Sequence, residues 1–445
     1  MKISVIGGTG YVGLVTGVGL AALGHKVICA DIDEKRVNDL NNNVLPIYEK
    51  GLNELLKKAR DERNIKFTSC LKSSVEDSDI IIIAVGTPES LNGETDMSQF
   101  MKVLKSIANN IDGYKVIVIK STVPVGTNEA SKRFLRKNIK NTGIKFDIVS
   151  NPEFLREGSA VNDFLNPERI IIGADSAKPI PAMKRMYGSF SCPLVLTDSK
   201  SAEMIKYACN AYLALRISYI NEIAEISQKV GADIDKVING MKLDKRIGGH
   251  YLSPGPGFGG PCLSKDIKSL INTGINVNAD VGLLKAVLNR NRVQISNILD
   301  HIRNDLCDIP GKRISVLGLS FKAGTNDIRN SPSVSVIEEL SKTKNEIVVY
   351  DPLIKQIEGH LNSKVTFAAT MEEAMYNSDC LIIMTEWDEF KQINFSYAYS
   401  IMRTPYIIDT RNLLSGREAN NMGFKYLGTG KIYNPGIDNA LREII

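Results

Sequence analysis

The stretch Ile3-Ser4-Val5-Ile6-Gly7-Gly8-Thr9-Gly10-Tyr11-Val12-Gly13 decides the fold. It begins with a short apolar run typical of a buried strand and ends with a G-x-G-x-x-G pattern. Gly8 allows a tight turn, Gly10 lets backbone N–H groups approach a pyrophosphate, and Gly13 lets the next helix pack against the strand. The N-terminus of a helix also attracts negative charge. The stretch therefore predicts a dinucleotide-binding turn, against the alternative of a glycine turn that is only structural.

An acidic residue follows in the place that this pattern requires. Lys26-Val27-Ile28-Cys29-Ala30 predicts the second strand, and Asp31 closes it, roughly 20 residues after the glycines. We expect Asp31 to accept hydrogen bonds from the adenosine ribose. Because its charge would repel a 2′-phosphate, NAD is favoured over NADP, although Arg36 nearby weakens this inference.

Further apolar runs extend the strand pattern through the chain. Ile80-Ile81-Ile82-Ile83-Ala84-Val85 and Val116-Ile117-Val118-Ile119 follow in the first half, and the pattern returns after Pro310-Gly311 with Arg313-Ile314-Ser315-Val316-Leu317-Gly318. Strands this continuous are typical of a parallel sheet that helices cover on both faces. Between these halves, residues from about 199 to 230 place apolar side chains at three- and four-residue steps, which predicts one long helix.

Cap-type residues bound this long helix, with Asp198-Ser199 at its start and Gly231 near its end. We therefore predict an α/β fold with two Rossmann-like, doubly wound parallel-sheet domains joined by a helical connector domain with a long central helix. The expected boundaries are 1–198 for the first Rossmann-like domain, 199–308 for the connector and 309–445 for the second Rossmann-like domain.

Composition limits the classes of function. The 445 residues include 55 basic and 50 acidic side chains, a formal charge of +5 that is spread without a long like-charge run. This mild bias fits small anionic ligands and predicts no nucleic-acid surface. The seven cysteines are scattered and never in C-x-x-C spacing, which fits a reducing cytoplasm and predicts no metal site. We expect no signal peptide, no transmembrane segment and no membrane partner.

One cysteine stands in an unusual setting. Cys262 lies in the segment Pro254-Gly255-Pro256-Gly257-Phe258-Gly259-Gly260-Pro261-Cys262-Leu263-Ser264-Lys265-Asp266, whose first half is too rich in glycine and proline for a regular element. Its thiol should therefore face solvent or a ligand, and Lys265 and the loop amides would favour the thiolate that attacks carbonyl groups. For the other six cysteines a role in the core is the better interpretation.

Other polar residues follow predicted strands or share a helix face. Lys206 and Asn210 stand one turn apart on the long helix, where an ammonium and an amide together can hold an oxyanion or a water. The segment from Asn151 to Gly158 follows a strand, so it lies at the carboxyl edge of the first sheet, where ligands bind. Thr87 and Thr122 also follow strands and suit the nicotinamide side. Each of these features alone is more often an ordinary loop or a solvated side chain.

Taken together, these segments closely resemble the UDP-glucose/GDP-mannose dehydrogenase family over nearly the whole chain. After the glycine pattern, the motifs in family order are Pro46-Ile47-Tyr48-Glu49, Asn151-Pro152-Glu153-Phe154-Leu155-Arg156-Glu157-Gly158, Phe258-Gly259-Gly260-Pro261-Cys262, and Phe321-Lys322 through Arg329. Asp244-Lys245-Arg246-Ile247-Gly248 resembles the UDP-glucose branch. Pro261, Leu263-Ser264 and Tyr251 depart from residues common in the family, which leaves substrate preference open.

The resemblance implies roles for individual positions. The implied catalytic set is the nucleophile Cys262 with Lys206, Asn210, Asp266, Glu153 and Thr122. The cofactor-binding set given by the glycine pattern and the resemblance together is Gly8, Gly10, Tyr11, Val12, Gly13, Asp31, Arg36, Thr87, Thr122, Glu157 and Arg329. The implied substrate-binding set is Phe154, Leu155, Glu157, Lys206, Asn210, Arg246, Tyr251, Gly259, Lys322 and Arg411. Within it, Arg246 would reach the sugar across a dimer interface, Lys322 would face the diphosphate, and Arg411 would face the sugar.

The implied reaction is the NAD-dependent four-electron oxidation of UDP-glucose to UDP-glucuronate through a cysteine thiohemiacetal and thioester, which would supply polysaccharide synthesis. The first domain would bind NAD, the connector would dimerise and the third would bind the UDP-sugar. The alternatives are oxidation of GDP-mannose or a UDP-N-acetylhexosamine, a two-electron β-hydroxyacid dehydrogenase, and a non-catalytic nucleotide-sugar sensor. Whether Asp266 or Glu153 activates the hydrolytic water stays open, as does assembly beyond a homodimer.

Overall fold

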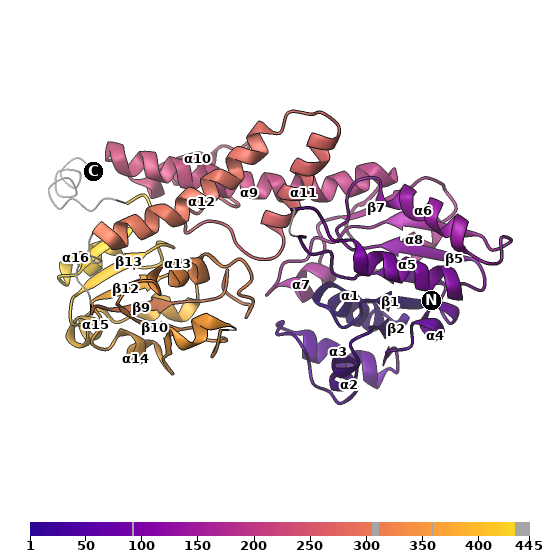
Figure 1. Cartoon of the computed structure of the whole chain (residues 1–445), viewed down its shortest axis with the longest axis horizontal. Helices are drawn as coiled ribbons and strands as arrows, with labels where there is room; N and C mark the ends of the chain where they lie inside the picture. Colours follow the sequence, from indigo (N-terminus) through magenta and orange to yellow (C-terminus); the bar gives the residue numbers. More distant parts are fainter. Residues whose placement is uncertain (91–92, 305–310, 358, 432–445) are drawn as a thin grey trace. The chain divides into compact units, whose positions relative to one another are not determined.

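The computed structural model describes residues 1–90, 93–304, 311–357 and 359–431. The chain divides into two compact units, residues 1–209 with 268–280 and residues 210–267 with 281–445. Each unit contains its own sheet, and helix α9 (Ser199–Val230) begins in the first unit and ends in the second (Figure 1). The prediction of two doubly wound α/β domains with a long central helix is confirmed.

The first unit is built on an eight-stranded sheet with the strand order β3-β2-β1-β4-β5-β6-β7-β8. Its strands are β1 (Lys2–Ile6), β2 (Lys26–Ala30), β3 (Ile65–Thr68), β4 (Ile80–Ile83), β5 (Lys115–Ile119), β6 (Phe146–Ser150), β7 (Ile170–Ala174) and β8 (Leu194–Thr197). Every neighbouring pair is parallel except β6 and β7, which are antiparallel. The strand order reverses between β1 and β4, which is where such sheets bind ligands.

Helices cover both faces of this sheet, which explains the continuous apolar runs. These helices are α1 (Tyr11–Ala22), α2 (Glu34–Asn41), α3 (Leu52–Asp61), α4 (Leu71–Glu76), α5 (Ser98–Asn110), α6 (Thr127–Asn138), α7 (Ala160–Leu165) and α8 (Ile180–Met186). Alternate side chains of a strand point to opposite faces. Ile80 and Ile82 of β4 accordingly join a core with α1, α3 and α7, whereas Ile81 and Ile83 join a core with α5.

The second unit contains a six-stranded sheet in which all neighbouring pairs are parallel. Its strands, in spatial order, are β11 (Thr366–Phe367), β10 (Glu346–Tyr350), β9 (Arg313–Leu317), β12 (Cys380–Ile383), β13 (Tyr406–Asp409) and β14 (Lys425–Gly428). Its helices are α13 (Pro332–Leu340), α14 (Met371–Met375), α15 (Phe395–Ile401) and α16 (Gly416–Asn421), with the 3-10 helices η2 (His360–Ser363) and η3 (Asp388–Gln392). The strand order reverses between β9 and β12.

Four helices lie between the two sheets in sequence, namely α9, α10 (Ile234–Leu243), α11 (Leu263–Asn276) and α12 (Gly282–Ile302). The caps predicted for α9 are present. The Asp198 carboxylate accepts a hydrogen bond from the backbone N–H of Ser201 at 2.8 Å, and Gly231 follows the last helical residue with a φ of +78°. That left-handed conformation favours glycine, so the helix ends where the sequence indicated. Within the described ranges, no helix combines the length and the apolar character needed to cross a bilayer.

Candidate active site

The glycine pattern forms a tight turn between β1 and α1. A Cβ atom on Gly13 would lie 2.0 Å from the Gly7 carbonyl oxygen, so only glycine allows this approach of helix and strand. The Asp31 carboxylate accepts hydrogen bonds from the Thr9 N–H at 3.1 Å and from the Thr9 hydroxyl at 2.7 Å. Asp31 is therefore fixed against the turn, at the end of β2, and the arrangement suits an adenosine ribose and pyrophosphate.

Tyr11, inside this pattern, is tied to a distant carboxylate to which the sequence analysis gave no role. Glu49 is buried and contacts the Tyr11 hydroxyl through Oε2, which also accepts a hydrogen bond from the Gly158 N–H at 2.8 Å. Its Oε1 accepts from the Ala160 N–H at 2.8 Å, at the start of α7. Burial and the hydrogen bond to Glu49 raise the pKa of Tyr11, so its phenol stays neutral. Glu49 thus joins the cofactor turn to the segment that contains Glu157.

Two predicted threonines meet where the first sheet reverses its order. The Thr87 hydroxyl donates a hydrogen bond to the Thr122 carbonyl oxygen at 2.7 Å, and the Ser121 hydroxyl donates to the Val85 carbonyl at 2.6 Å. These bonds join the loops that follow β4 and β5. Since the Thr87 hydroxyl is used in this way, it shapes the loop that follows β4.

Lys206 and Glu153 form a buried ion pair. The Lys206 Nζ lies 3.1 Å from Glu153 Oε1, and the side chains are 6% and 8% exposed. Glu153 Oε2 also accepts a hydrogen bond from the Leu155 backbone N–H. The Phe154 ring lies 5.2 Å from the Lys206 ammonium, while Leu155 packs against the core of the first unit. Two predicted positions of the Asn151–Gly158 segment, Glu153 and Phe154, therefore lie beside Lys206.

A second lysine, Lys120, lies beside this pair and was not predicted. It is buried just after β5, and its Nζ lies 3.4 Å from the Asn151 Oδ1 atom. Burial lowers the pKa of Lys120 to about 8, the Glu153 carboxylate opposes that shift and the Lys206 ammonium adds to it. The signal in the sequence was a lysine directly after the buried run Val116–Ile119, where a charged residue needs a partner.

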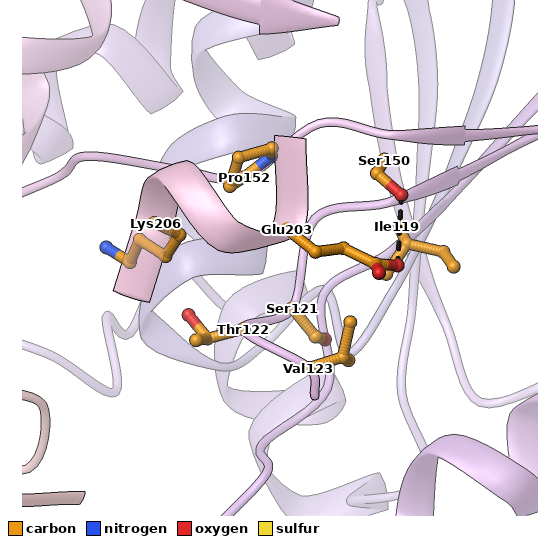
Figure 2. A pocket seen from close by; sticks show the side chains of 8 residues that line it. All are labelled: Ile119, Ser121, Thr122, Val123, Ser150, Pro152, Glu203 and Lys206. Atoms are coloured by element: carbon orange, nitrogen blue, oxygen red, sulfur yellow. Dashed lines mark hydrogen bonds between the residues drawn. The ribbon is translucent and has the colours of Figure 1, made fainter. Parts of the chain in front are cut away.

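Glu203, one turn before Lys206 on α9, is another residue that the sequence analysis missed. Its carboxylate accepts hydrogen bonds from the N–H groups of Gly126 and Asn128 at 2.6 and 2.8 Å, at the start of α6. Burial raises the pKa of Glu203, against the lowering effect of these hydrogen bonds. Figure 2 shows its carboxylate directed at Ser150 while the Lys206 ammonium points away from it.

A small cavity lies between these side chains. Its volume of about 10 Å³ corresponds to one water position, and its lining residues are Ile119, Ser121, Thr122, Val123, Ser150, Pro152, Glu203 and Lys206 (Figure 2). Polar groups on several sides could hold a water there. The first unit therefore places Thr122, Glu203 and Lys206 around this cavity at the carboxyl edge of its sheet.

In the second unit, the structure groups three other predicted residues at the start of α11. The thiol of Cys262 is exposed, and its carbonyl oxygen accepts a hydrogen bond from the Asp266 N–H at 2.9 Å. The Asp266 carboxylate is 1% exposed and accepts from the Asn210 amide at 2.6 Å and from the Lys265 ammonium at 2.7 Å. A helix N-terminus favours the thiolate form of a cysteine, so the setting suits a nucleophile.

Two asparagines hold the loop before this cysteine, and neither was predicted. Asn291 of α12 accepts from the Phe258 N–H at 2.8 Å and donates to the Phe258 carbonyl at 3.0 Å. A Cβ atom on Gly257 would lie 2.6 Å from Asn291 Oδ1, and Gly257 has a φ of +104°. Asn221 of α9 accepts from the Gly255 N–H at 2.8 Å. The loop conformation is thus set by side chains that lie more than thirty residues away in sequence.

Three of the residues predicted for the UDP-sugar, Gly259, Lys322 and Arg411, lie on loops of the second unit. The Arg411 guanidinium donates to the Met384 carbonyl at 2.9 Å and to the Phe321 carbonyl at 3.2 Å, so it joins the loops after β12 and β9. Lys322 lies beside the Phe321 ring, 5.6 Å from its centroid. Gly259 packs against the Asn330 carbonyl, 2.5 Å from where a Cβ atom would stand.

Three predicted arginines lie at the surface. Arg36 is paired with Asp33 at 3.3 Å, and the Arg329 guanidinium is paired with Asp327. The Arg246 side chain is 90% exposed and is paired with Asp244 at 2.6 Å. Tyr251 has a φ of +58°, a strained conformation for an aromatic residue. Over the part of the chain that the structure describes, no group of three or more His, Cys, Asp or Glu side chains is arranged to hold a metal ion.

Comparison with known families gives three consecutive matches. The NAD binding domain of the UDP-glucose/GDP-mannose dehydrogenase family matches residues 1–191, its central domain matches residues 200–293, and its UDP binding domain matches residues 315–416. Along the chain, the first match covers strands of the first sheet, the second covers helices between the two sheets, and the third covers strands of the second sheet.

Full-length relatives and solved structures agree with these matches. The UDP-glucose 6-dehydrogenase TuaD of Bacillus subtilis (strain 168) is 42% identical over 97% of this chain and 93% of its own length. The UDP-glucose 6-dehydrogenase of Rickettsia conorii is 39% identical over 97% of this chain and 99% of its own. The structure of a UDP-glucose dehydrogenase from Pyrobaculum islandicum superimposes with a TM-score of 0.89 at 32% identity, covering 97% of this chain and 98% of that one.

Proposed function

Because the chain belongs to the UDP-glucose/GDP-mannose dehydrogenase family, we propose that it oxidises the C6 alcohol of UDP-glucose to UDP-glucuronate with NAD⁺. The full-length likeness to relatives named for this activity carries the proposal. The balanced reaction takes one UDP-glucose, two NAD⁺ and one water to UDP-glucuronate, two NADH and three protons. We retain 1–198, 199–308 and 309–445 as the proposed cofactor-binding, connector and UDP-sugar-binding domains.

The residues of the first unit fit NAD. Gly13 lets α1 pack closely on the turn after β1, so that the backbone N–H groups at the start of the helix would face a pyrophosphate, and the Asp31 carboxylate is fixed for a ribose. The cofactor supplies the hydride acceptor when it is bound. The protein's part is to orient it, with Thr122 and the loop shaped by Thr87 on the nicotinamide side.

In the proposed first oxidation, C6 loses a hydride and its hydroxyl loses a proton, which gives an aldehyde. Lys206 and Asn210 stand on consecutive turns of α9 and would stabilise the negative charge that develops on the oxygen. Glu153 keeps the Lys206 ammonium in place through its 3.1 Å ion pair. A network of this kind accepts the proton through an adjacent water.

In the proposed second oxidation, the Cys262 thiolate adds to the aldehyde carbon and a thiohemiacetal forms, so that the intermediate is not released. Loss of a second hydride gives a thioester, and water then breaks the C–S bond and releases the acid and the thiol. We propose that Asp266 activates this water, because its carboxylate lies on the first turn of the helix that Cys262 precedes.

We also propose that the chain acts as a homodimer in the cytoplasm. Tyr212, Tyr219 and Ile226 recur every seven residues on α9, and each side chain is at least half exposed. Such an apolar stripe on a long helix suits contact with a second copy, and Arg246 would then reach the partner's sugar site. Tyr219→Glu should convert dimers to monomers in light scattering after gel filtration, whereas the charge change Glu222→Lys on the same helix should not.

The proposed location is the cytoplasm because it suits an enzyme that depends on a reduced thiol.

The decisive experiment is the ratio of NADH formed to limiting UDP-glucose in excess NAD⁺, with GDP-mannose and UDP-N-acetylglucosamine as controls. Two NADH per UDP-glucose is the expected result. One NADH would indicate a two-electron dehydrogenase. If no NADH formed with UDP-glucose but two NADH formed per molecule of a control sugar, that sugar would be the substrate. If no NADH formed with any of the three, the protein would be a nucleotide-sugar sensor.

A further inference from the structure

A second cavity lies in the second unit, and none of the catalytic, cofactor-binding or substrate-binding residues named above lines it. Its volume is about 370 Å³, and it lies between the C-terminal halves of α9 and α12 and the carboxyl ends of β13 and β14. Ligand cavities in proteins begin near this size, at about 300 Å³. The carboxyl end of a parallel sheet is also where α/β folds bind small molecules. Both features make it a candidate binding site.

The cavity wall is polar, and besides Glu225 it carries two carboxylates that already have partners. Asp300 pairs with Arg303 at 3.3 Å, and Asp409 accepts hydrogen bonds from the Leu414 N–H and the Tyr426 hydroxyl, each at 2.8 Å. Carboxamides come from both helices and include Gln228, Gln294 and Asn297. The carboxylate of Glu225 is already occupied, because Lys229 and Arg290 form ion pairs with it at 2.7 and 2.6 Å. These contacts lower the pKa of Glu225 to about 2. The groups left for a ligand are therefore mainly amides and hydroxyls.

The wall also selects against other ligand classes. Its lining includes Thr410 and Thr429 but no Phe, Tyr or Trp side chain, so the imidazole of His301 is the only ring among the lining residues on which a nucleobase could stack. Its lysine is paired with a carboxylate, so a phosphate would have no concentration of positive charge. A sugar hydroxyl both donates and accepts hydrogen bonds, as a carboxamide does. Neutral polyhydroxyl molecules match this wall best.

One buried amide on this wall has unused hydrogen-bonding capacity. Asn221 is 1% exposed, and its Oδ1 accepts the Gly255 N–H, but its Nδ2 donor has no hydrogen-bond partner among the described residues. A buried donor without a partner costs about 1 to 3 kcal/mol, so a group that accepts from it is favoured.

The same wall is connected to the cysteine loop. Gln294 also lines the cavity, and its Nε2 donates to the Gly255 carbonyl at 2.8 Å. Asn221 and Gln294 thus hold both backbone groups of Gly255, seven residues before Cys262. A ligand that engages these two amides acts on the hydrogen bonds that fix the loop.

We propose that this cavity binds a small neutral polyhydroxyl molecule, such as a free hexose or hexitol, and that binding changes the exposure of Cys262 through Asn221 and Gln294. This site is separate from the proposed UDP-sugar site, and its function would be regulatory. It requires neither NAD nor turnover, so it can be tested whether or not the proposed reaction is correct.

The test uses sorbitol and D-glucose as probes on the full chain. Binding is measured by saturation-transfer NMR, and the rate at which iodoacetamide alkylates Cys262 is measured by peptide mass spectrometry. Asn297→Trp fills the cavity, and Ser296→Trp adds the same bulk at the exposed neighbouring position. In the unmodified chain and in Ser296→Trp, we expect the polyol to bind saturably and to change the alkylation rate of Cys262 at least twofold relative to the protein without polyol. In Asn297→Trp, binding should weaken at least tenfold and the rate should not respond.

Three results would overturn the proposal. If Asn297→Trp bound the polyol as tightly as the unmodified chain does, the polyol would bind elsewhere, for example in the UDP-sugar site. If Asn297→Trp does not fold, Gln228→Trp fills the cavity in its place. Binding of inorganic phosphate but of neither polyol would show that the ligand class is wrong. Saturable binding to the unmodified chain without any change in the alkylation rate of Cys262 would show that the cavity does not act on the cysteine loop.

Discussion

The Lys206 ammonium lies 3.1 Å from the Glu153 carboxylate, and less than a tenth of either side chain is exposed. A buried pair of this kind contributes little net stability, but the loss of one partner leaves an uncompensated charge. Here two ammonium groups depend on one carboxylate, because Lys120 is also buried beside Glu153. The pair therefore links the stability of the first unit to its proposed chemistry.

Glu153→Gln should destabilise the protein by about 3 to 5 kcal/mol, because it leaves Lys206 charged and unpaired in the interior. Urea denaturation of the mutant and of the unmodified chain measures this difference. The double variant Glu153→Gln/Lys206→Met should recover part of the loss, since it removes the stranded charge. A single-mutant effect below about 1 kcal/mol would show that water reaches the pair and screens it.

Lys120 gives a prediction with a definite sign of pH dependence. Its pKa of about 8 in the folded protein is below the unfolded value of 10.5, so the unfolded chain binds more protons between these pH values. The stability of the unmodified chain should therefore rise with pH from about 8 to 10, relative to Lys120→Met, by roughly 1 to 2 kcal/mol. Denaturation curves at pH 7.5, 8.5 and 9.5 measure it. A difference that stays constant with pH would mean that Lys120 remains protonated throughout.

The proposed covalent step predicts a specific failure in Cys262→Ser. This variant should form at most one NADH per active site and should then stop, because a serine hydroxyl is a much weaker nucleophile than a thiolate. Rapid mixing with excess NAD⁺ counts the NADH of the first turnover. Cys70→Ser removes another exposed thiol and should keep full activity. Steady formation of UDP-glucuronate by Cys262→Ser would rule out the thioester.

Much of the fold was visible in the sequence because its determinants are local. The isoleucines of β4 form a continuous run since both faces of the sheet are covered, and Gly13 is required by a helix that contacts its own preceding strand. The antiparallel strand β7 was not predicted, because a short apolar run such as Ile170–Ala174 carries no information on its direction.

The contacts that complete the candidate site were less visible because their partners are distant in sequence. Asn291 holds Phe258 from 33 residues away, and Glu49 accepts from Gly158 across 109 residues. An asparagine on a helix and a glutamate after a loop look like solvated residues until the fold brings them to a buried backbone N–H. The sequence therefore indicated the residues proposed to react, whereas the residues that hold them required the structure.

The identity of the hydrolytic base can be decided by comparing two carboxamide variants. Each carboxylate is paired with a lysine, Asp266 with Lys265 and Glu153 with Lys206, but Asp266 lies on the first turn of the helix that Cys262 precedes. Asp266→Asn should therefore release two NADH per site in a burst and then turn over at least a hundredfold more slowly, because the thioester forms but is not hydrolysed. Intact-protein mass spectrometry after quenching should detect the acylated enzyme. Glu153→Gln should instead slow the first NADH, since Lys206 loses its partner. Accumulation of the thioester in Glu153→Gln and not in Asp266→Asn would assign the base to Glu153.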